Sequence, residues 1–481
     1  METGMPLQAL RWLSSLTFCA TAALAQTPPP PEPSASAVMD LLRQAAPQVV
    51  PFSAEEIDRV QAGKGLTDCF WVGTVSPATF NILSPDRAVT YWISQFSLPE
   101  GAKLVLKGEY PRARYMSFAS YNPLGQPVDG LADDGIAPDA GSVNPFRPGA
   151  QRLAMPRQFT VNVQARAALQ AGVRVDEATR PANTIFVPTG EATYQLWLRV
   201  YAPDDGLGPL GGAKLPRPVM TLADGSQVEG DALCRGQVVK DQAVRDFRAS
   251  KAGNQAMFAV PGAKAPYHPA QPVPRWNGFY NPLLTMASVL INTPFEEARN
   301  RMDATRRSGF YGTLDNYYMS AYVDDRYGEL LVVQGKAPRT PYTLQGNAVM
   351  DANVDLRYWS FCKGRSIHDG AVDACLMDEQ VPLDANQRYT LVVSTPANRP
   401  ANARAECGVA WLPWGVGDGM DNPHGGYIIH RHMKPSPGFT QSLWATQKPG
   451  DEAATLGEYY PVPAYQARAG FEALGCPVKK P

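Results

Sequence analysis

The chain has 481 residues, with 44 Lys and Arg against 45 Asp and Glu, a net charge of −1 and a pI near 6.5. A nearly neutral chain without a basic block lacks the concentrated cationic face that nucleic-acid binding requires, so we expect no nucleic-acid partner. Only 19% of the residues are charged, while 45 Pro and 41 Gly are abundant, and this mix favours many short strands joined by turns.

The first 25 residues have the three parts of a secretory signal. Arg11 supplies a positive charge, residues 12–22 form an apolar run, and residues 23–25 (Ala-Leu-Ala) form a small-x-small cleavage site. We therefore expect cleavage after Ala25 and a periplasmic or secreted protein. The alternative is lipid anchoring through Cys19, which lies in the apolar run. No later stretch reaches the roughly 18 apolar residues of a membrane-spanning helix, so we expect no membrane span.

The rest of the chain divides by composition into six segments. The Pro-rich residues 26–36 predict a linker, and the apolar spacing of residues 37–69 predicts a helical lead-in. Runs of β-branched and aromatic residues bounded by Gly and Pro then predict strands. We expect a first β-sandwich repeat at 70–218, a connector with a helix after Pro294 at 219–316, a second β-sandwich repeat at 317–436, and a Pro-rich C-terminal tail at 437–481.

The two predicted β-regions share an internal repeat. Residues 114–118 (Arg-Tyr-Met-Ser-Phe) recur as residues 357–361 (Arg-Tyr-Trp-Ser-Phe), at an offset of 243 (357 − 114). Further matches keep the same order: 128–131 with 372–375, 159–163 with 389–393, 186–188 with 411–413, and 198–203 with 430–435. Collinear matches at one long period indicate a duplicated domain. The predicted fold is mainly β, with two tandem jelly-roll-like antiparallel sandwiches.

Strand alternation predicts which side chains form each core. In the first copy Met116 and Phe118 share one face, and Trp359 and Phe361 hold the same positions in the second copy. Bulky apolar residues keep this parity in both copies, so we expect it to face the core.

The same motifs carry a resemblance to a known family. Residues 335–338 (Gly-Lys-Ala-Pro), 357–362 (Arg-Tyr-Trp-Ser-Phe-Cys), 398–403 (Asn-Arg-Pro-Ala-Asn-Ala) and 411–415 (Trp-Leu-Pro-Trp-Gly) resemble bacterial exported proteins of unknown function with paired jelly-roll-like domains. The chain departs from those modules at Ala410, where they carry Asn. The resemblance implies paired β-domains and brings no established reaction.

The strongest chemical signal is His430-Arg431-His432 on a predicted strand, because the chain has only five histidines. A period of two places His430 and His432 on one face, within reach of a single divalent metal ion, and His424, Asp418 and Asp421 could add ligands. Their repeat partners are Leu198 and Val200, which indicates the alternative of core histidines that only form hydrogen bonds.

Aromatic residues gather in the second repeat. Exposed aromatic rings on a β-sandwich stack on sugars or apolar ligands, whereas buried rings fill the interior. The candidate ligand-binding residues are Tyr358, Trp411, Trp414, Tyr427 and Arg431.

Six cysteines follow the expected cleavage site, and an even number in an exported chain indicates disulfides. If the strands flanking residues 363–374 pair symmetrically, Cys362 faces Cys375 at a distance that permits a disulfide, and Ala119 and Leu131 are the equivalents in the first repeat. A shift of one residue would make Cys407 the competing partner of Cys375.

Three functions fit these features. The first is an exported protein that binds a small molecule or glycan at the aromatic-rich second domain or between the domains. The second is a metal-dependent enzyme that uses His430 and His432 to activate a bound water. The third is a structural envelope protein.

Overall fold

The structure is a computed structural model that describes residues 68–123, 125–234, 270–278, 311–349, 353–365, 370–417 and 422–478. All of these belong to one compact unit, residues 42–481. The expected signal segment, the linker, nearly all of the helical lead-in and the helix after Pro294 lie outside the described residues. Among the helices of the described part, none has the length and apolar character needed to cross a membrane.

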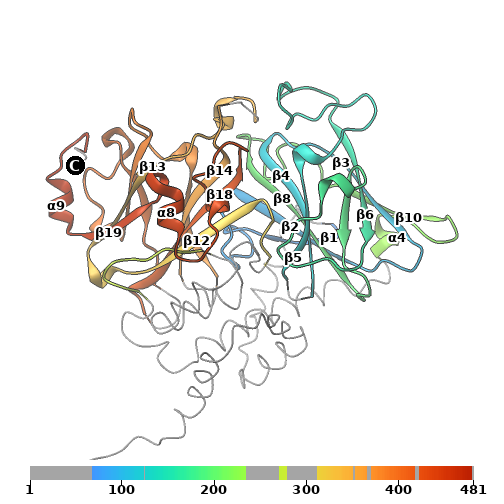
Figure 1. Cartoon of the computed structure of the whole chain (residues 1–481), viewed down its shortest axis with the longest axis horizontal. Helices are drawn as coiled ribbons and strands as arrows, with labels where there is room; N and C mark the ends of the chain where they lie inside the picture. Colours follow the sequence, from blue (N-terminus) through green and yellow to red (C-terminus); the bar gives the residue numbers. More distant parts are fainter. Residues whose placement is uncertain are drawn as a thin grey trace, which may run out of the picture. The chain divides into compact units, whose positions relative to one another are not determined.

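The first repeat forms two facing sheets (Figure 1). One sheet has the strand order β1-β2-β8-β4-β5, and the other has the order β10-β9-β3-β6-β7. Their bounds are β1 Trp71–Val75, β2 Val89–Phe96, β3 Lys103–Glu109, β4 Ala113–Tyr121, β5 Pro127–Ala132, β6 Gln158–Ala165, β7 Thr184–Val187, β8 Tyr194–Pro203, β9 Arg217–Thr221 and β10 Gln227–Glu229, followed by the short helix α4 at Asp231–Cys234.

The second repeat restates this arrangement. Its sheets have the orders β11-β12-β18-β14-β15 and β17-β16-β13-β19. The bounds are β11 Asn277–Gly278, β12 Asn316–Asp324, β13 Leu330–Lys336, β14 Leu356–Gly364, β15 Val372–Met377, β16 Arg388–Ser394, β17 Ala410–Pro413, β18 Gly425–Pro435 and β19 Val462–Gln466, with short helices α8 at Glu452–Leu456 and α9 at Arg468–Glu472. The tandem β-sandwich prediction is therefore confirmed.

The strand pairing gives the equivalent positions of the two repeats. Met116 pairs with Val200, and Trp359 pairs with His432, so the matches at offsets 243 and 232 are correct. Two of the sequence matches, 128–131 with 372–375 and 186–188 with 411–413, differ from the equivalences that the strand register gives. Gly130 is the equivalent of Cys375, a shift of one residue, and Ile185 is the equivalent of Leu412, a shift of two.

Details of the strands also differ from the expectation. Each sandwich contains one parallel pair, β6 with β7 and β16 with β17, so the sheets are mixed rather than wholly antiparallel. Strands β10 and β11 lie in the segment predicted as a connector, β9 crosses from the predicted first repeat into it, and β19 lies in the segment predicted as a tail. These strands were missed because they have at most five residues, with a Pro in β9 and in β19, and so few residues do not show a period-two pattern.

The predicted core parity is correct in both repeats. Met116 and Phe118 lie in the core of the first sandwich, and Trp359 and Phe361 lie in the core of the second. Local packing details are duplicated as well. The indole of Trp71 donates to the carbonyl of Pro216 at 2.9 Å, and the indole of Trp276 donates to the carbonyl of Pro461 at 2.7 Å.

An equivalent glycine in each core admits an aromatic ring. A Cβ atom at Gly108 would lie 2.6 Å from the ring of Phe159, and a Cβ atom at Gly335 would lie 3.1 Å from the ring carbon of Tyr389 that bears the hydroxyl. Both separations are shorter than ordinary carbon contacts. Glycine is therefore required at these two strand positions by packing rather than by backbone conformation.

Candidate functional site

The sheets that contain β4 and β14, the strands with the repeated Arg-Tyr-x-Ser-Phe motif, bury their outward faces against each other. Tyr115 and Tyr201 of the first sandwich pack in one cluster with Tyr358 and Met433 of the second. The rings of Tyr201 and Tyr358 meet edge to face at 5.4 Å. Strand alternation places these residues on the face opposite the core, and that face forms the contact between the repeats. We call this contact the seam.

Two buried arginine–aspartate pairs cross the seam in opposite directions. Arg114 of β4 lies 2.6 Å from Asp378, which follows β15. Arg357 of β14 lies 3.2 Å from Asp133, which follows β5. The arginines hold equivalent positions, and so do the aspartates. The repeats therefore contact each other as the subunits of a twofold dimer would.

A segment of the first repeat, residues 81–88, docks on the second sandwich, and we call it the first latch. Asn81 exchanges two hydrogen bonds of 2.9 Å with the backbone of Val372. The N–H of Ser84 donates to the carbonyl of Gly370 at 2.7 Å. Ser84 has a φ of 56°, a left-handed conformation that is uncommon outside glycine and costs free energy. The docking contacts hold the latch in this conformation.

Residues 311–315 of the second repeat dock on the first sandwich in the same way, and we call them the second latch. Tyr311 is the equivalent of Ser84, has a φ of 51°, and donates its N–H to the carbonyl of Gly125 at 2.7 Å. Gly125 and Gly370 are themselves equivalent positions. Each repeat therefore holds the latch of the other.

An arginine on the longest strand of each sandwich, β8 or β18, binds the latch of the other repeat. Arg431 donates from Nη2 to the carbonyl of Ser84 at 2.6 Å, and Arg199 donates from Nη2 to the carbonyl of Tyr311 at 2.6 Å. Both arginines are 1% exposed. The duplication has therefore preserved a buried guanidinium and one of its acceptors on each side of the seam.

The two arginines differ in what else they contact. Arg431 Nη1 lies 2.9 Å from Cys362 Sγ and 3.5 Å from a carboxylate oxygen of Asp86. The equivalent of Asp86 in the second latch is Thr313. The pair equivalent to Cys362 and Cys375 is Ala119 and Gly130, which offers no side-chain acceptor. The surroundings of Arg199 thus lack both the carboxylate and the sulfur that lie beside Arg431.

Arg199 consequently has two unpartnered donors, whereas Arg431 has one, its Nε. Its Nη2 reaches the Tyr121 hydroxyl and the carbonyls of Tyr311 and Gly312, but Nε and Nη1 have no hydrogen-bond partner. No carboxylate of the described residues lies within ion-pair distance of it. A buried cation with unmet donors is costly unless a ligand or counterion satisfies it.

Aromatic rings enclose the Arg199 guanidinium. Its central carbon lies 5.4 Å from the ring centre of Tyr91, 5.6 Å from that of Trp197 and 5.8 Å from that of Tyr121. Burial raises the pKa of Tyr91, of Tyr121 and of the neighbouring Tyr318. These phenols are therefore neutral at neutral pH. They stabilise the cation through their ring faces but do not neutralise it.

Three of the predicted binding residues lie at the first latch. Tyr358 donates its hydroxyl to Asp86 at 2.9 Å, the Tyr427 hydroxyl lies 2.5 Å from the Ser84 hydroxyl, and Arg431 holds the Ser84 carbonyl. All three are at most 2% exposed. The structure thus brings them together at the seam, where they bind the chain's own latch.

The other two predicted binding residues lie elsewhere. Trp414 is 1% exposed and donates its indole N–H to the carbonyl of His424 at 3.0 Å. Trp411 is half-buried, donates to Ser394 Oγ at 3.0 Å, and carries Arg399 over its ring at 4.3 Å. Both indoles therefore have protein partners, and their ligand-binding role stays a prediction.

His430 and His432 lie in the core and hydrogen-bond to each other. His432 Nδ1 accepts from the N–H of Leu443 at 3.3 Å, so its proton sits on Nε2, which donates to His430 Nε2 at 2.9 Å. His430 Nδ1 then donates to the carbonyl of Ser360 at 3.1 Å. Burial lowers the pKa of His430 to about 3 and that of His432 well below its usual range. Both rings are neutral.

This network leaves no ring lone pair for an ion. His424 lies six residues before His430, roughly 20 Å away along an extended strand, and its Nδ1 is 2.6 Å from a carboxylate oxygen of Asp325. Asp418 and Asp421 lie outside the described residues. The metal site stays a prediction, while the geometry favours the alternative of hydrogen-bonded core histidines.

The predicted hairpin disulfide is present. Cys362 lies opposite Cys375 in the register, their Cα atoms are 4.0 Å apart, and the sulfurs are bonded. Cys407 pairs with Cys476 instead of competing for Cys375. The predicted first-repeat equivalents, Ala119 and Leu131, were wrong by one residue: the pair is Ala119 and Gly130, because the hairpin connection of the second repeat is two residues longer than that of the first and the sequence match implied only one.

Sequence reasoning missed Arg199, Asp86 and the two arginines of the crossed ion pairs. The available signal was the repeat itself, which aligned Arg199 with Arg431 and Arg114 with Arg357. A charged residue kept in both copies on the face opposite the core, as Arg199 and Arg431 are, indicates a buried contact between the copies. Arg114 and Arg357 have the same parity as the core residues Met116 and Trp359, so their signal was the recurrence alone. Asp86 had no such signal, because its equivalent is a threonine.

Comparisons with known proteins found structural likenesses but no family. No family model matches this chain, and no curated protein matches it. An uncharacterized protein from Burkholderia cenocepacia has a similar structure, with 12% identity over 86% of this chain and 94% of that chain and a TM-score of 0.44. A protein from Vibrio parahaemolyticus is 12% identical over 89% of this chain and 99% of that chain, with a TM-score of 0.37. Neither likeness carries an argument about function.

Proposed function

We propose that the chain is an exported binding protein that holds a small anionic molecule at the seam, against Arg199. The observation that carries this proposal is the buried guanidinium whose Nε and Nη1 have no partner. A carboxylate, phosphate or similar group would supply the missing charge and two acceptors in the forked geometry that a guanidinium favours.

The equivalent arginine supports the choice of an anion. Arg431 has the carboxylate of Asp86 and a cysteine sulfur beside it. Arg199 has threonine, alanine and glycine at the corresponding positions, so an external anion would take the place that the chain fills for Arg431. The two missing sulfur atoms favour a small occupant, and the rings of Tyr91 and Trp197 suit the apolar part of a small organic acid or an acidic sugar.

Export is supported by the disulfides. Cys362–Cys375 and Cys407–Cys476 would persist in an oxidising compartment and be reduced in the cytosol. The signal-like first 25 residues are consistent with this, and the mass of the mature protein would test cleavage after Ala25.

Thermal unfolding in the presence of small anions tests the proposal. Purified protein at constant ionic strength would be titrated with formate, acetate, glucuronate, phosphate and chloride. A ligand that binds only the folded state stabilises it by about 2.7 kcal/mol at one hundred times its Kd. We expect at least one anion to raise the midpoint in a saturable manner.

The equivalent arginine provides the matched control. Arg199→Gln should remove the saturable anion response, and Arg431→Gln should keep it, although both variants lose a buried cation. Arg199→Lys keeps the charge without the planar fork and should bind weakly. A full response in Arg199→Gln, or no response of the wild type to any anion, would contradict the proposal, and the second result would favour a structural role.

A further inference from the structure

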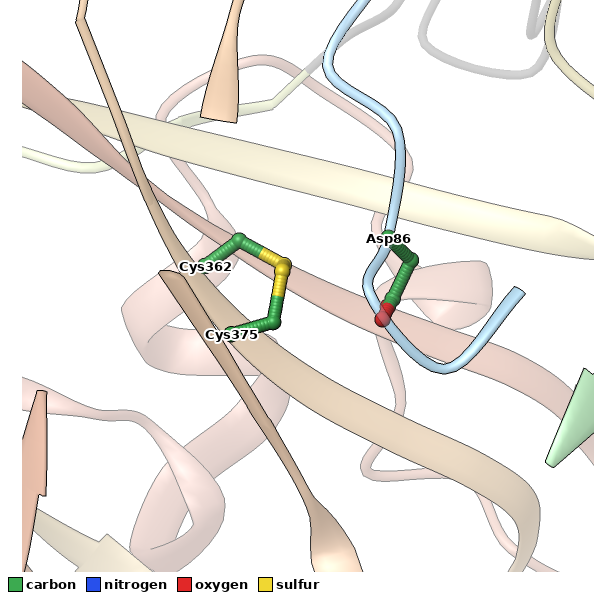
Figure 2. Close-up of side chains that lie close together, drawn as sticks. All are labelled: Asp86, Cys362 and Cys375. Atoms are coloured by element: carbon green, nitrogen blue, oxygen red, sulfur yellow. A yellow bond between two sulfur atoms is a disulfide. The ribbon is translucent and has the colours of Figure 1, made fainter. Parts of the chain in front are cut away.

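A second cluster of ligand atoms lies at the first latch. Figure 2 shows the Cys362–Cys375 disulfide beside the Asp86 side chain, which reaches it from a distant part of the chain. The two sulfurs and a carboxylate oxygen lie within 4.8 Å of one another, and all three residues are buried. The latch thus adds a hard oxygen ligand to two sulfurs that the hairpin already holds together.

The Asp86 carboxylate is oriented before any ion binds. One oxygen accepts from the N–H of Ala88 at 3.0 Å, and the other accepts from the hydroxyls of Tyr358 at 2.9 Å and Ser360 at 2.5 Å. Hydrogen bonds of this kind fix a metal-ligating carboxylate and raise metal affinity. Asp86 is 0% exposed, so its position is set by protein contacts rather than by water.

We propose that reduction of the Cys362–Cys375 disulfide creates a site for one thiophilic divalent cation, with Zn²⁺ as the class, bound by the two cysteines and Asp86. A dithiol reductant supplies two electrons and two protons, its own sulfurs become a disulfide, and Cys362 and Cys375 become thiols. Binding of the cation then releases both thiol protons. Two thiolates and one carboxylate form a set that Zn²⁺ accepts, with a fourth position open to water.

The local charges favour a divalent ion over an empty dithiolate. Two thiolates and Asp86 carry three negative charges, and Arg431 carries one positive charge beside Cys362. A divalent cation brings the buried sum to zero, whereas two thiolates alone would leave it at minus two, which burial disfavours. The cation would bridge the repeats, because Asp86 belongs to the first latch and both cysteines to the second sandwich.

The chain contains a matched control for this site. Cys407 and Cys476 also form a disulfide, and Cys407 Sγ accepts from Arg404 at 3.3 Å. In the described part of the chain, the ligand-atom cluster at Asp86 is the only one of its kind, so the second disulfide has no carboxylate partner there. Its reduction should therefore yield thiols without a comparable metal site.

Cadmium titration of the reduced protein tests the inference. The full chain would be reduced with a phosphine under nitrogen, desalted, and titrated with Cd²⁺ while the ultraviolet thiolate-to-metal absorption is followed. We expect one tightly bound Cd²⁺ per chain. It should be retained in the Cys407→Ser/Cys476→Ser variant, lost in Cys362→Ser/Cys375→Ser, and bound at least about tenfold more weakly by Asp86→Asn.

Alkylation mapping keeps the test independent of how well the variants fold. Cd²⁺ should protect Cys362 and Cys375 of the reduced wild type from alkylation, while Cys407 and Cys476 stay reactive. Equal protection of Cys407 and Cys476, or unchanged affinity in Asp86→Asn, would overturn the three-ligand site. The anion response at Arg199 is measured on oxidised protein, so either proposal can fail without the other.

Discussion

The two latches are built on one plan and differ in what surrounds their arginine. Ser84 and Tyr311 share a left-handed backbone and a 2.6 Å hydrogen bond from an arginine of the other repeat. Around Arg431 the chain provides a carboxylate and a disulfide, whereas around Arg199 it provides neither. A duplicated fold thus kept the contact that joins its halves, and the side chains beside that contact diverged.

The comparison also shows how the seam is held. Two equivalent ion pairs, Arg114 with Asp378 and Arg357 with Asp133, join the copies in opposite directions, and their carboxylates are buried. Buried pairs add little net stability over apolar residues, but breaking one leaves a charge without compensation. These pairs are therefore better understood as setting the register between the repeats.

The largest effect should come from breaking a crossed pair. Arg114→Met leaves Asp378 buried without its cation and should lower the free energy of unfolding by about 3–5 kcal/mol, measured by urea unfolding. Arg357→Met is the matched variant and should cost less, because Arg114 has close contacts with Glu379 and Thr343 besides Asp378, whereas Arg357 lies 3.2 Å from Asp133 and its further contacts, with Asp134 and the Arg114 carbonyl, are longer. Equal losses would show that these extra contacts contribute nothing.

The stability lost on removing Cys362–Cys375 or Cys407–Cys476 should increase with the length of the loop that each disulfide closes. Cys407→Ala/Cys476→Ala opens a loop of 69 residues and should cost about 4 kcal/mol on the loop-entropy model, and Cys362→Ala/Cys375→Ala opens a loop of 13 and should cost about 3 kcal/mol. Urea midpoints with the measured m-values would give both. A larger loss for the shorter loop would mean that the first latch depends on the disulfide it covers.

The Asp133 pair should make stability depend on pH. Burial, which outweighs the attraction of Arg357, raises the pKa of Asp133 from 3.8 to about 6. Between these values the folded state binds a proton that the unfolded state does not, so this group's contribution to stability falls as pH rises from about 4 to about 6. The two-unit shift corresponds to about 2–3 kcal/mol.

Comparison with Asp133→Asn isolates this contribution, because the acids with lowered pKa values act in the opposite direction in both proteins. Asp324 and Asp355 are examples, since hydrogen bonds and arginines lower their pKa values. Urea unfolding of both proteins from pH 4 to pH 7 should show the wild type losing about 2–3 kcal/mol relative to the variant. A constant difference would mean that Asp133 is ionised throughout.

The smallest effect should come from making the second latch resemble the first. Thr313→Asp places a carboxylate at the position equivalent to Asp86, where it should pair with Arg199 and raise stability by about 1 kcal/mol in anion-free buffer. The variant should also lose the saturable anion response. Thr313→Asn, which is similar in size but uncharged, should keep it. A Thr313→Asp variant that still responds like the wild type would separate the anion site from the latch.

Local sequence signals determined the fold class and much of the register. The repeat of Arg-Tyr-x-Ser-Phe, the alternation of Met116 and Phe118, and the turn between Cys362 and Cys375 are features of neighbouring residues, because a strand exposes its period-two pattern directly. They correctly predicted two β-sandwiches, their core faces and one disulfide. Short strands such as β9 and β19 escaped detection, since Pro-containing segments of five residues carry too few positions for a period to appear.

Tertiary structure alone decided what the second face of each sheet does. Tyr115, Arg199 and Arg431 lie on the face that alternation assigns away from the core, and in a single sandwich that face would meet water. Here it is buried because the repeats close on each other and exchange latches. The partners of these buried arginines come from residues more than a hundred positions away, such as Asp86 for Arg431 and the Tyr311 carbonyl for Arg199. Local patterns cannot specify such contacts, because they depend on how the two folded repeats pack.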